Sequence, residues 1–477
     1  MKPGQQIKSH QMNRNLNHPN WKDVVTVNGA DFHDQRISIC VTTYSSQSYY
    51  THACLESLRA WKSPLHELIV ACHDASLLME YYLKACKEDG LIDKLLFTPS
   101  QYGHIKGVNL CFEHATGDML FNIANDILIG PALVEDCAHQ LRTQPQLGLI
   151  GWHWYSEGTI WKDGRLAQYR IRDQKNPVLE ESHIRNIRNA PWFTGKYFEG
   201  IGGALWISLC NTAFFGIRKD LWKQVGGFSD IYKHYWADDF LGYAVLDQGL
   251  DVRPFAKKFR SPEFFDEFQF QNNDVEDRRR DHDSIKLPPA LESVFEHLGG
   301  GTQAAERELL YWIARSLPEN GTILHVGMWR GTSLLVMMAA LKQKKMKFIG
   351  LDHFDDPGMA RLSTQPEVTR EEVIGYMQPF IGREHTIELI KAKSLDLREF
   401  PKADLIFIDA IHLKKHLDHE IELAKAAINP GGLIIFHDYG QSMWPDVKAA
   451  VDEHFPKDKI KVFHTLAVIE FGDPSTI

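Results

Sequence analysis

The sequence predicts an α/β protein with two domains, each built on a largely parallel sheet, and three observations predict it. Apolar runs typical of buried strands alternate with helical stretches from residue 36 to residue 126. A similar alternation returns after residue 304, where a strand leads through a glycine turn into a helix. Between the two, residues 261–289 are polar and contain a Pro pair, which indicates a connector.

The length of 477 residues allows two or three domains with full cores. We divide the chain into a lead-in at 1–35, a first domain at 36–270, a linker at 271–303 and a second domain at 304–477. Hydrophobic residues make up 44% and charged residues 24%, as in an ordinary globular protein. The net charge of −9 and the lack of a basic face argue against nucleic acid as a partner.

The compartment follows from what the sequence lacks. No segment reaches the roughly 18 apolar residues of a membrane span, and Met1–Asn20 has no apolar signal core. The seven cysteines are odd in number and form no C-x-x-C, which favours free thiols in a reducing compartment. We therefore expect a cytoplasmic protein, with a peripheral position on the inner face of the membrane and a homo-oligomeric state left open.

The first domain begins with alternating strands and helices. In order, we expect a strand at Arg36–Tyr44, a helix at His52–Trp61, a strand at Glu67–Cys72, a helix at Leu77–Glu88 and a short strand at Lys94–Phe97. Ligands bind at the carboxyl ends of the strands in open α/β sheets. Thr42, Thr43, Tyr44 and Asp74 should therefore gather at one edge.

A glycine-containing turn at Tyr102–Asn109, a helix to His114 and a strand at Met119–Asp126 complete this pattern. With these motifs the N-terminal half resembles the inverting family-2 glycosyltransferases of the GT-A fold. Asn125-Asp126 stand where that family has its D-x-D motif, with Ala124 at the first position. The resemblance implies a nucleotide-sugar site made of Thr42, Tyr44, Asp74, Lys106, Asn109, Asn125 and Asp126.

The resemblance also implies a divalent metal at Asp126. Mg²⁺ and Mn²⁺ prefer oxygen ligands and bridge phosphates, and they offset the charge that builds on a leaving diphosphate. A strand-terminal turn would also explain Asn125-Asp126, because such residues are common there.

Asp238 and Asp239 match the acidic pair that the family places before a helix on the acceptor side. An inverting transfer needs a carboxylate to accept the acceptor's proton, and the resemblance assigns that role to Asp239. A helix N-cap is the alternative reading of the pair, and both can hold together. The many aromatic residues between 150 and 200 suit either sugar recognition or core packing.

The second domain opens with the strand Ile323–Val326, followed by Gly327, Gly331 and a helix from Thr332 to Leu341. Asp352 ends the next strand about 20 residues after Gly331, where nucleotide-type folds place a ribose partner. The G-x-x-x-G spacing disfavours a dinucleotide and suits S-adenosylmethionine, which has no pyrophosphate. A tight turn in any α/β sheet would give the same glycine spacing.

The rest of the second domain supplies polar residues at three more strand ends. We expect strands at Thr386–Ile390, Asp404–Asp409, Leu433–Phe436 and Leu466–Phe471, and helices at Lys415–Ile428 and Trp444–Phe455. Ser394, His412 and the pair His437-Asp438 follow the first three of these strands.

This half, from Glu306 to Phe471, resembles a class I S-adenosylmethionine-dependent O-methyltransferase of Rossmann-like fold, in the metal-dependent group related to macrocin and catechol methyltransferases. The resemblance implies cofactor contacts from His325, Gly327, Gly331, Ser333, Asp352, Ser394 and Asp409. His325 stands where relatives often carry Glu.

The same resemblance implies Asp409 and Asp438 as ligands of Mg²⁺ or Mn²⁺, with His437 as a third. His412 is the candidate general base, because imidazole titrates near neutral pH. A surface histidine at a helix entry and a hydrogen-bonded strand end are the alternative readings of His412 and His437.

The hypothesis from sequence is a bifunctional enzyme. One half would transfer a sugar from a nucleotide-diphosphate sugar to a glycan or glycolipid acceptor, as in polysaccharide biosynthesis, and the other would methylate a sugar hydroxyl. Fusion would raise the local concentration of a shared intermediate. Two alternatives stay open: one half is a non-catalytic glycan-binding or docking module, or the second half binds nucleotide or hydroxylates instead of methylating.

Overall fold

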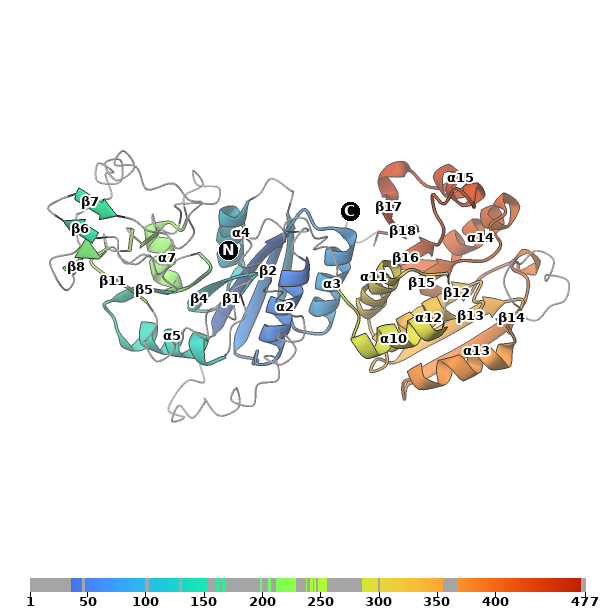
Figure 1. Ribbon diagram of the computed structural model, residues 1–477, viewed down its shortest axis with the longest axis horizontal. Coiled ribbons are helices and arrows are strands. Elements are labelled where there is room, and N and C mark those ends of the chain that lie inside the picture. Colours follow the sequence, from blue (N-terminus) through green and yellow to red (C-terminus); the bar gives the residue numbers. More distant parts are fainter. Residues whose placement is uncertain are drawn as a thin grey trace, which may run out of the picture. The chain divides into compact units, whose positions relative to one another are not determined.

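The computed structural model divides into two compact units (Figure 1). It describes residues 36–44, 48–98, 103–127, 131–151, 160–162, 165–168, 198–199, 205–206, 212–228, 237, 241–242, 244–245, 248–254, 285–298, 301–354 and 368–472. The first unit comprises Met1–Ala75 and Leu91–His282, and the second comprises Ser76–Gly90 and Asp283–Ile477. The predicted lead-in, the aromatic-rich stretch and the pair Asp238-Asp239 lie wholly or largely outside the described residues.

The first unit contains a mixed seven-stranded sheet. Its strands, in spatial order, are β11 (Asp251–Pro254), β5 (Leu147–Gly151), β10 (Phe214–Arg218), β4 (Met119–Ala124), β1 (Ile37–Tyr44), β2 (His66–His73) and β3 (Lys94–Thr98). The four strands from β4 to β3 run parallel, as the sequence predicts. The strand β10 runs antiparallel to both β4 and β5, so the complete sheet is mixed. A small four-stranded sheet contains β6 (Ile160–Lys162), β7 (Arg165–Gln168), β8 (Phe198–Glu199) and β9 (Leu205–Trp206).

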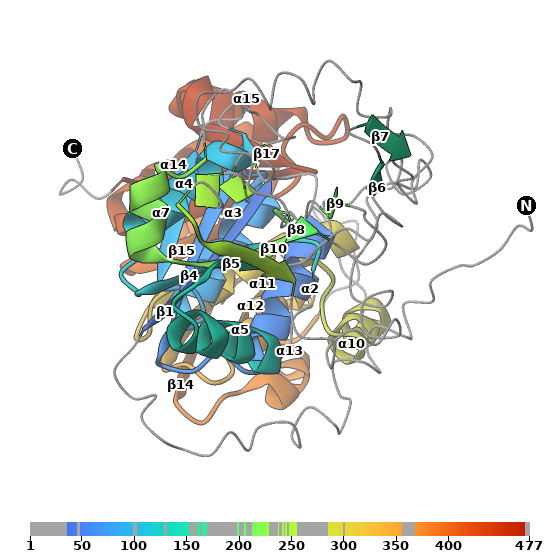
Figure 2. The ribbon, with the colours of Figure 1, turned by 90° about the vertical axis from the view of Figure 1, so that its left-hand side faces the viewer.

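Helices cover this first sheet. The helices α4 (His104–His114) and α7 (Lys219–Val225) pack their apolar residues on one face, against alternate residues of β1, β4, β5 and β10 (Figure 2). Phe112 and Trp222 meet edge to face, with ring centroids 4.6 Å apart. The helices α2 (Ser48–Arg59) and α5 (Pro131–Thr143) also belong to the described part of this unit. This packing places the N-terminus of α4 beside the carboxyl ends of β1 and β2, where Gly107 lies against His73 and Thr42.

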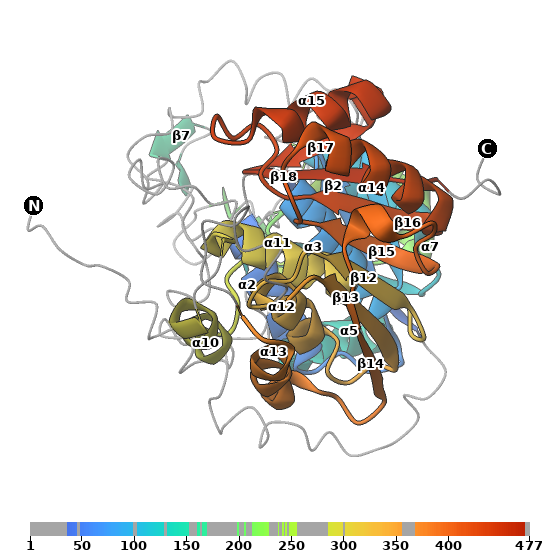
Figure 3. The same ribbon diagram turned by 90° about the vertical axis from the view of Figure 1, so that its right-hand side faces the viewer.

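The second unit is built around another seven-stranded sheet (Figure 3). Its strands, in spatial order, are β14 (His385–Lys391), β13 (Met346–Asp352), β12 (Thr322–Val326), β15 (Ala403–Ile408), β16 (Ile428–Phe436), β18 (Leu466–Glu470) and β17 (Ile460–Phe463). The first five are parallel, and β18 is antiparallel to β16 and β17. The order reverses between β12 and β15, and a sheet of this kind binds its ligand at such a point.

Helices cover both faces of the second sheet. The helices α14 (Lys414–Ala427) and α15 (Pro445–His454) pack on one face, and α10 (Pro289–Leu298), α11 (Ala304–Arg315), α12 (Thr332–Ala340) and α13 (Arg370–Met377) lie on the other (Figure 3). The core beneath α14 and α15 takes Leu324 and Val326 from β12 and Phe436 from β16. Because side chains alternate along a strand, His325 and His437 point to the α11 side. The sequence places these residues at strand ends but does not tell which face they take.

The helix α3 (Leu77–Glu88) groups with the second unit, although in the chain it connects β2 to β3. In that unit the Tyr82 ring meets Trp312 edge to face at 4.8 Å, and the Tyr81 hydroxyl donates a hydrogen bond to Glu470 at 2.6 Å. Arg315 pairs with Asp89 at 2.7 Å. The predicted linker also contains α10, whose Glu292 pairs with Arg307 of α11.

Two predictions made from composition can be compared with the structure. Six of the seven cysteines are described, and all six are free and buried, in agreement with the predicted thiols. None of the helices in the described part of the chain combines the length and apolar character needed to cross a membrane.

Candidate functional site

Several of the predicted residues of the first domain lie at the carboxyl ends of β2, β1 and β4. Thr42 pairs with Ala124 across the β1–β4 ladder, and Tyr44 pairs with His73 across β1–β2. Asp126 lies one turn beyond β4, and burial raises its pKa to about 6. The affinity of such a carboxylate for a cation would depend on pH, because protons compete with the cation near neutrality.

Two predicted nucleotide-sugar contacts are engaged with other parts of the protein. The Asn125 amide nitrogen donates to the hydroxyls of Thr43 at 3.2 Å and Thr51 at 3.1 Å. The Asn109 amide donates to the carbonyl of Phe228 at 2.8 Å and accepts from its backbone N–H at 3.0 Å. Asn125 therefore joins the end of β4 to β1 and α2, and Asn109 joins α4 to the segment after α7, while their roles in ligand binding stay predictions.

The other predicted residues of this edge differ in exposure. Tyr44 and Asp74 are exposed where β1 and β2 end, and Lys106 is exposed in the first turn of α4. Asp74 has φ of 48°, a left-handed conformation that non-glycine residues seldom adopt. Thr42 is buried, and its hydroxyl lies 2.6 Å from Nδ1 of His104. The catalytic pair Asp238-Asp239 lies outside the described residues.

In the second unit, the glycine turn after β12 lies directly on the end of β15. Gly327 has φ of +81°, and a Cβ there would lie 2.2 Å from the carbonyl oxygen of Asp409, so only glycine fits. Gly331 has φ of +75° and precedes α12, whose Ser333 is buried in the first turn. Asp352 accepts the backbone N–H groups of Met328 at 2.5 Å, Trp329 at 2.9 Å and Phe354 at 2.8 Å. The acid thus fixes the shape of the turn, and the ribose contact predicted for it stays a prediction.

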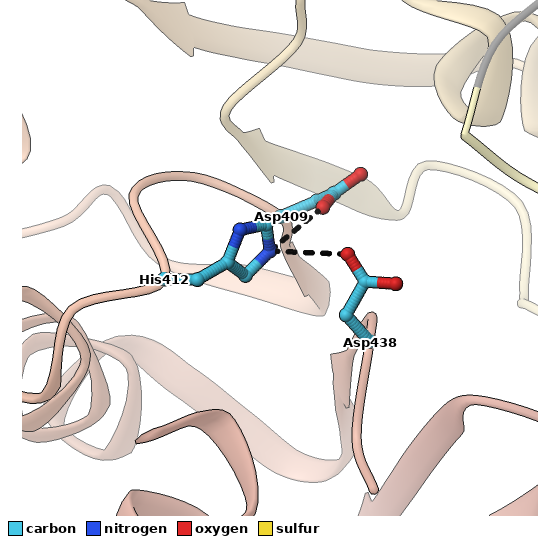
Figure 4. Close-up of side chains that lie close together, drawn as sticks. All are labelled: Asp409, His412 and Asp438. Atoms are coloured by element: carbon cyan, nitrogen blue, oxygen red, sulfur yellow. Dashed lines mark ion pairs between the residues drawn. The ribbon is translucent and has the colours of Figure 1, made fainter. Parts of the chain in front are cut away.

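Asp409, His412 and Asp438 bring their side chains to one point (Figure 4). Their ligand atoms all lie within 4.8 Å of one another. Nε2 of His412 is 3.4 Å from an oxygen of Asp409 and 3.4 Å from an oxygen of Asp438. Two carboxylates and an imidazole at these distances suit Mg²⁺, Mn²⁺ or another divalent ion. The pair predicted as ligands, Asp409 and Asp438, is therefore close enough to share an ion.

His437 lies beside this group with both ring nitrogens near carboxylates. Nδ1 is 3.2 Å from Asp409 and 3.4 Å from Asp438, and Nε2 is 3.4 Å from Glu306. Burial alone lowers the pKa of His437, but the charge of Asp409 and hydrogen bonds to the three carboxylates outweigh burial and raise it far above its usual value. The pKa of Asp409 is held well below its usual range, because the effects of His437 and His412 exceed that of burial.

His325, a predicted cofactor contact, is buried on β12, and neither ring nitrogen has a hydrogen-bond partner among the described residues. Burial lowers its pKa to about 4, so the ring is neutral near pH 7. A neutral imidazole offers one nitrogen acceptor and one N–H donor. The buried ring therefore has unused hydrogen-bonding capacity for a ligand.

Glu420 on α14 is a fully buried carboxyl near Ser394 and His412. Burial raises its pKa from 4.5 to about 7, against the opposing influence of these two residues. The folded protein therefore holds this carboxyl neutral in a range where the unfolded chain ionises it.

This difference makes stability depend on pH. Because the folded pKa is raised, the contribution to stability is present below pH 4.5 and is lost as the pH rises to about 7. Glu420→Gln stays neutral, so its stability relative to the wild type should rise by about 3 kcal/mol over that range and then level off. Urea unfolding of the full chain at a series of pH values tests this, and a difference independent of pH would contradict it.

Sequence reasoning missed His104, Glu306 and Glu420. His104 and Glu420 are single polar residues in helical stretches, which resemble ordinary surface positions in a sequence. Glu306 carries a local signal, since Gln303 and Glu306 form a capping box at the start of α11. That signal points to a helix start and not to a site, because Thr465 and His437 reach Glu306 only in the folded chain.

Two parts of the chain match models of known protein families. Residues 38–209 match the model of glycosyl transferase family 2, and residues 324–439 match the model of a methyltransferase domain. The chain joins a family-2 glycosyltransferase domain to a methyltransferase domain. The fold class and the two families predicted from the sequence are thereby confirmed, and both domains are transferases.

The solved structures similar to this chain are distant. The O-methyltransferase NovP is 17% identical, with 38% of this chain and 79% of that chain covered and a TM-score of 0.28. The mannosyltransferase PcManGT from Pyrobaculum calidifontis, in complex with GDP-Man and Mn²⁺, is 15% identical over 51% of this chain and 60% of that chain, with a TM-score of 0.31. CalS11, a TDP-rhamnose 3'-O-methyltransferase, is 14% identical over 40% and 97%, with a TM-score of 0.27. None of the curated proteins compared with the chain matches it.

Proposed function

We propose that the chain transfers a sugar from a nucleotide-diphosphate sugar to a glycan or glycolipid acceptor and methylates a sugar hydroxyl with S-adenosylmethionine. The observation that carries the proposal is the group Asp409, His412 and Asp438 at the strand ends of a methyltransferase domain, in a chain that also has a family-2 glycosyltransferase domain. Two transferase domains on one chain keep a shared glycan at high local concentration.

In the glycosyltransferase domain, Asp126 is the residue proposed to hold a divalent ion. Such an ion, when bound, offsets the charge that develops on the leaving diphosphate. Thr42, Tyr44, Asp74 and Lys106 are the proposed contacts of the nucleotide sugar. Asp239 is the proposed base, with Asp238 beside it, and it would take the proton from the acceptor hydroxyl as the sugar is inverted.

The raised pKa of Asp126 predicts a pH dependence for this domain. The ion binds the carboxylate form, so protonation competes with binding below about pH 6. Affinity for Mn²⁺ with a nucleoside diphosphate should fall about tenfold for each pH unit below that value. Calorimetric titration between pH 5 and pH 8 measures it. An affinity that stays constant over this range would contradict the role of Asp126.

In the methyltransferase domain, several residues fit S-adenosylmethionine. The close turn at Gly327 and Gly331 leads into α12, as in a site where backbone approaches a nucleoside. The neutral ring of His325 can accept a hydrogen bond from the cofactor's ammonium, where relatives often use a carboxylate. Ser333, Asp352, Ser394 and Asp409 complete the proposed set of cofactor contacts.

Asp409 and Asp438 are the residues proposed to hold a divalent ion in this domain. The ion, when bound, would lower the pKa of a sugar hydroxyl and orient it toward the methyl group. His412 lies beside both carboxylates and is proposed to take the hydroxyl proton.

Because Nε2 of His412 lies within the same group, His412 could instead ligate the ion, and one nitrogen cannot do both. The variant His412→Gln separates the two roles. If His412 is the base, His412→Gln should lose methyl transfer but keep its affinity for Mn²⁺. If His412 is a ligand, the affinity for Mn²⁺ should fall as well.

One observation favours a second function for the first domain, that of a non-catalytic glycan-binding module. Ala124 stands at the first position of the metal motif, and Asn125 is bound within a hydroxyl network. Calorimetry with a nucleoside diphosphate and Mn²⁺ distinguishes a glycosyltransferase from a glycan-binding module. The module would not bind the nucleoside diphosphate together with Mn²⁺.

The proposed function is tested by incubating the full chain with a panel of nucleotide sugars, isotopically labelled S-adenosylmethionine and glycan acceptors. We expect one donor to yield a product that carries both the new sugar and the labelled methyl group. Absence of both transfers over a broad acceptor panel would contradict the proposal.

A further inference from the structure

We propose that Glu306 positions the carboxylates of Asp409 and Asp438 by holding His437 between them. The inference rests on the proposed function of the second domain and adds to it a residue on α11 that the strand-end motifs do not include. Glu306 forms no hydrogen bond or ion pair with Asp409 or Asp438 among the described residues, so its effect on them passes through the imidazole of His437.

Glu306 is itself held firmly. It is fully buried at the third position of α11, where Oε2 accepts the backbone N–H of Gln303 at 2.8 Å. Its other oxygen, Oε1, accepts the backbone N–H of Thr465 at 3.1 Å and the Thr465 hydroxyl at 2.5 Å. A buried carboxylate with this many donors has one orientation, and a group that it binds is oriented with it.

The group that it binds is Nε2 of His437, at 3.4 Å. The His437 ring is buried, and its backbone N–H donates to the carbonyl of Ile408 at 3.1 Å, which ties it to the end of β15. With Nε2 fixed on one side, Nδ1 on the other side of the ring points to Asp409 and Asp438, 3.2 and 3.4 Å away. Glu306, His437 and the two aspartates thus form a continuous chain of contacts.

This chain of contacts has a clear effect on the site. Asp409 and Asp438 repel each other, and a ring nitrogen that lies within reach of both draws their oxygens toward one point. Without Glu306 the ring loses the partner that fixes its rotation. The aspartates would then be less well placed for an ion, even though both are still present. Outer residues of this kind change metal affinity by roughly 10- to 100-fold.

The test is Mn²⁺ affinity measured by calorimetry on the full chain carrying Asp126→Asn, so that the first domain does not contribute. In this parent, Glu306→Gln should raise the Kd for Mn²⁺ by about tenfold or more. The matched control is Glu308→Gln, which changes a buried glutamate two residues along the same helix that pairs with Lys286 at 3.2 Å. The control should leave the Kd within about twofold of the parent.

Two further measurements separate positioning from a loss of structure. The affinity for S-adenosylhomocysteine should fall far less than the affinity for Mn²⁺ in Glu306→Gln, because Asp409 is the one proposed cofactor contact that Glu306 positions through His437. Thr465→Val keeps the Glu306 charge but removes one donor, and should raise the Kd for Mn²⁺ by a smaller factor. If Glu306→Gln does not fold, the Kd for Mn²⁺ of Thr465→Val tests the positioning role by itself.

An unchanged Kd for Mn²⁺ in both Glu306→Gln and Thr465→Val would overturn the inference while leaving the proposed function intact. Equal rises in Glu306→Gln and Glu308→Gln would overturn it as well. A parent that binds no Mn²⁺ at all would overturn the proposed metal site and this inference together.

Discussion

Replacing Asp409 by asparagine is expected to reduce methyl transfer by about a thousandfold or more while sugar transfer continues at the wild-type rate. Asp409 supplies one of two carboxylates to the group with His412 and Asp438, and it also lies 3.2 Å from His437. The substitution removes a proposed metal ligand and takes from the buried ring of His437 the carboxylate that most raises its pKa. The rate of methyl transfer from labelled S-adenosylmethionine measures the effect.

The control for this variant is Glu388→Gln on the edge strand β14, a half-exposed acid paired with Lys347 at 3.1 Å. It changes the same amount of charge in the same domain and should leave both transfers unchanged. Methyl transfer by Asp409→Asn at more than about a tenth of the wild-type rate would contradict the assignment of Asp409 to the metal site.

The second large effect is expected from Asp239→Asn, which should lower the turnover number for sugar transfer by roughly 10² to 10⁴ and leave methyl transfer of a preformed acceptor intact. The amide cannot accept the acceptor's proton, but it keeps the size of the side chain and its capacity to cap a helix. Steady-state rates with saturating donor and acceptor measure the change.

Asp220→Asn is the matched control for Asp239→Asn, because Asp220 lies in the same domain with a side chain that is 84% exposed. An unchanged turnover number in Asp239→Asn would contradict the role of Asp239 as the base and would favour the helix-cap reading, because asparagine caps a helix as well as aspartate does. Equal losses in both variants would also contradict the catalytic role.

The site in the second domain could be predicted largely because parallel strands end at one edge. Asp409 and Asp438 follow strands that are neighbours in the sheet, so their proximity follows from their order in the sequence. The turn after β12 also shows in the sequence as a glycine. Gly327 lies so close to the Asp409 carbonyl that a side chain would not fit there. Local pattern and global fold agree at these positions.

Glu306 could not be predicted in the same way. It reaches His437 from a helix that packs on one face of the sheet, and alternation along β16 decides that His437 points to that face. A strand-end motif does not reveal which face its last residue takes. Contacts across 131 residues of sequence depend on helix packing, which sequence periodicity alone leaves open.

The first domain shows another limit of prediction. Asn109 and Asn125 were assigned to the ligand by resemblance, but their amides bind Phe228, Thr43 and Thr51. An amide serves a backbone group and a sugar diphosphate equally well, so the residue type does not separate the two roles. The antiparallel direction of β10 could not be predicted either, because the sequence of an apolar strand of five residues does not indicate which way it runs in the sheet.

Two acidic strand-end sites on this one chain are each proposed to take a divalent ion. Anomalous scattering from crystals of the full chain grown with Mn²⁺, a nucleoside diphosphate and S-adenosylhomocysteine tests it most directly. We expect one peak within coordination distance, about 2.1 Å, of Asp126 and another within that distance of Asp409 and Asp438. Occupied S-adenosylhomocysteine with no manganese peak at Asp409 and Asp438, or nucleoside diphosphate bound away from Asp126, would contradict the account.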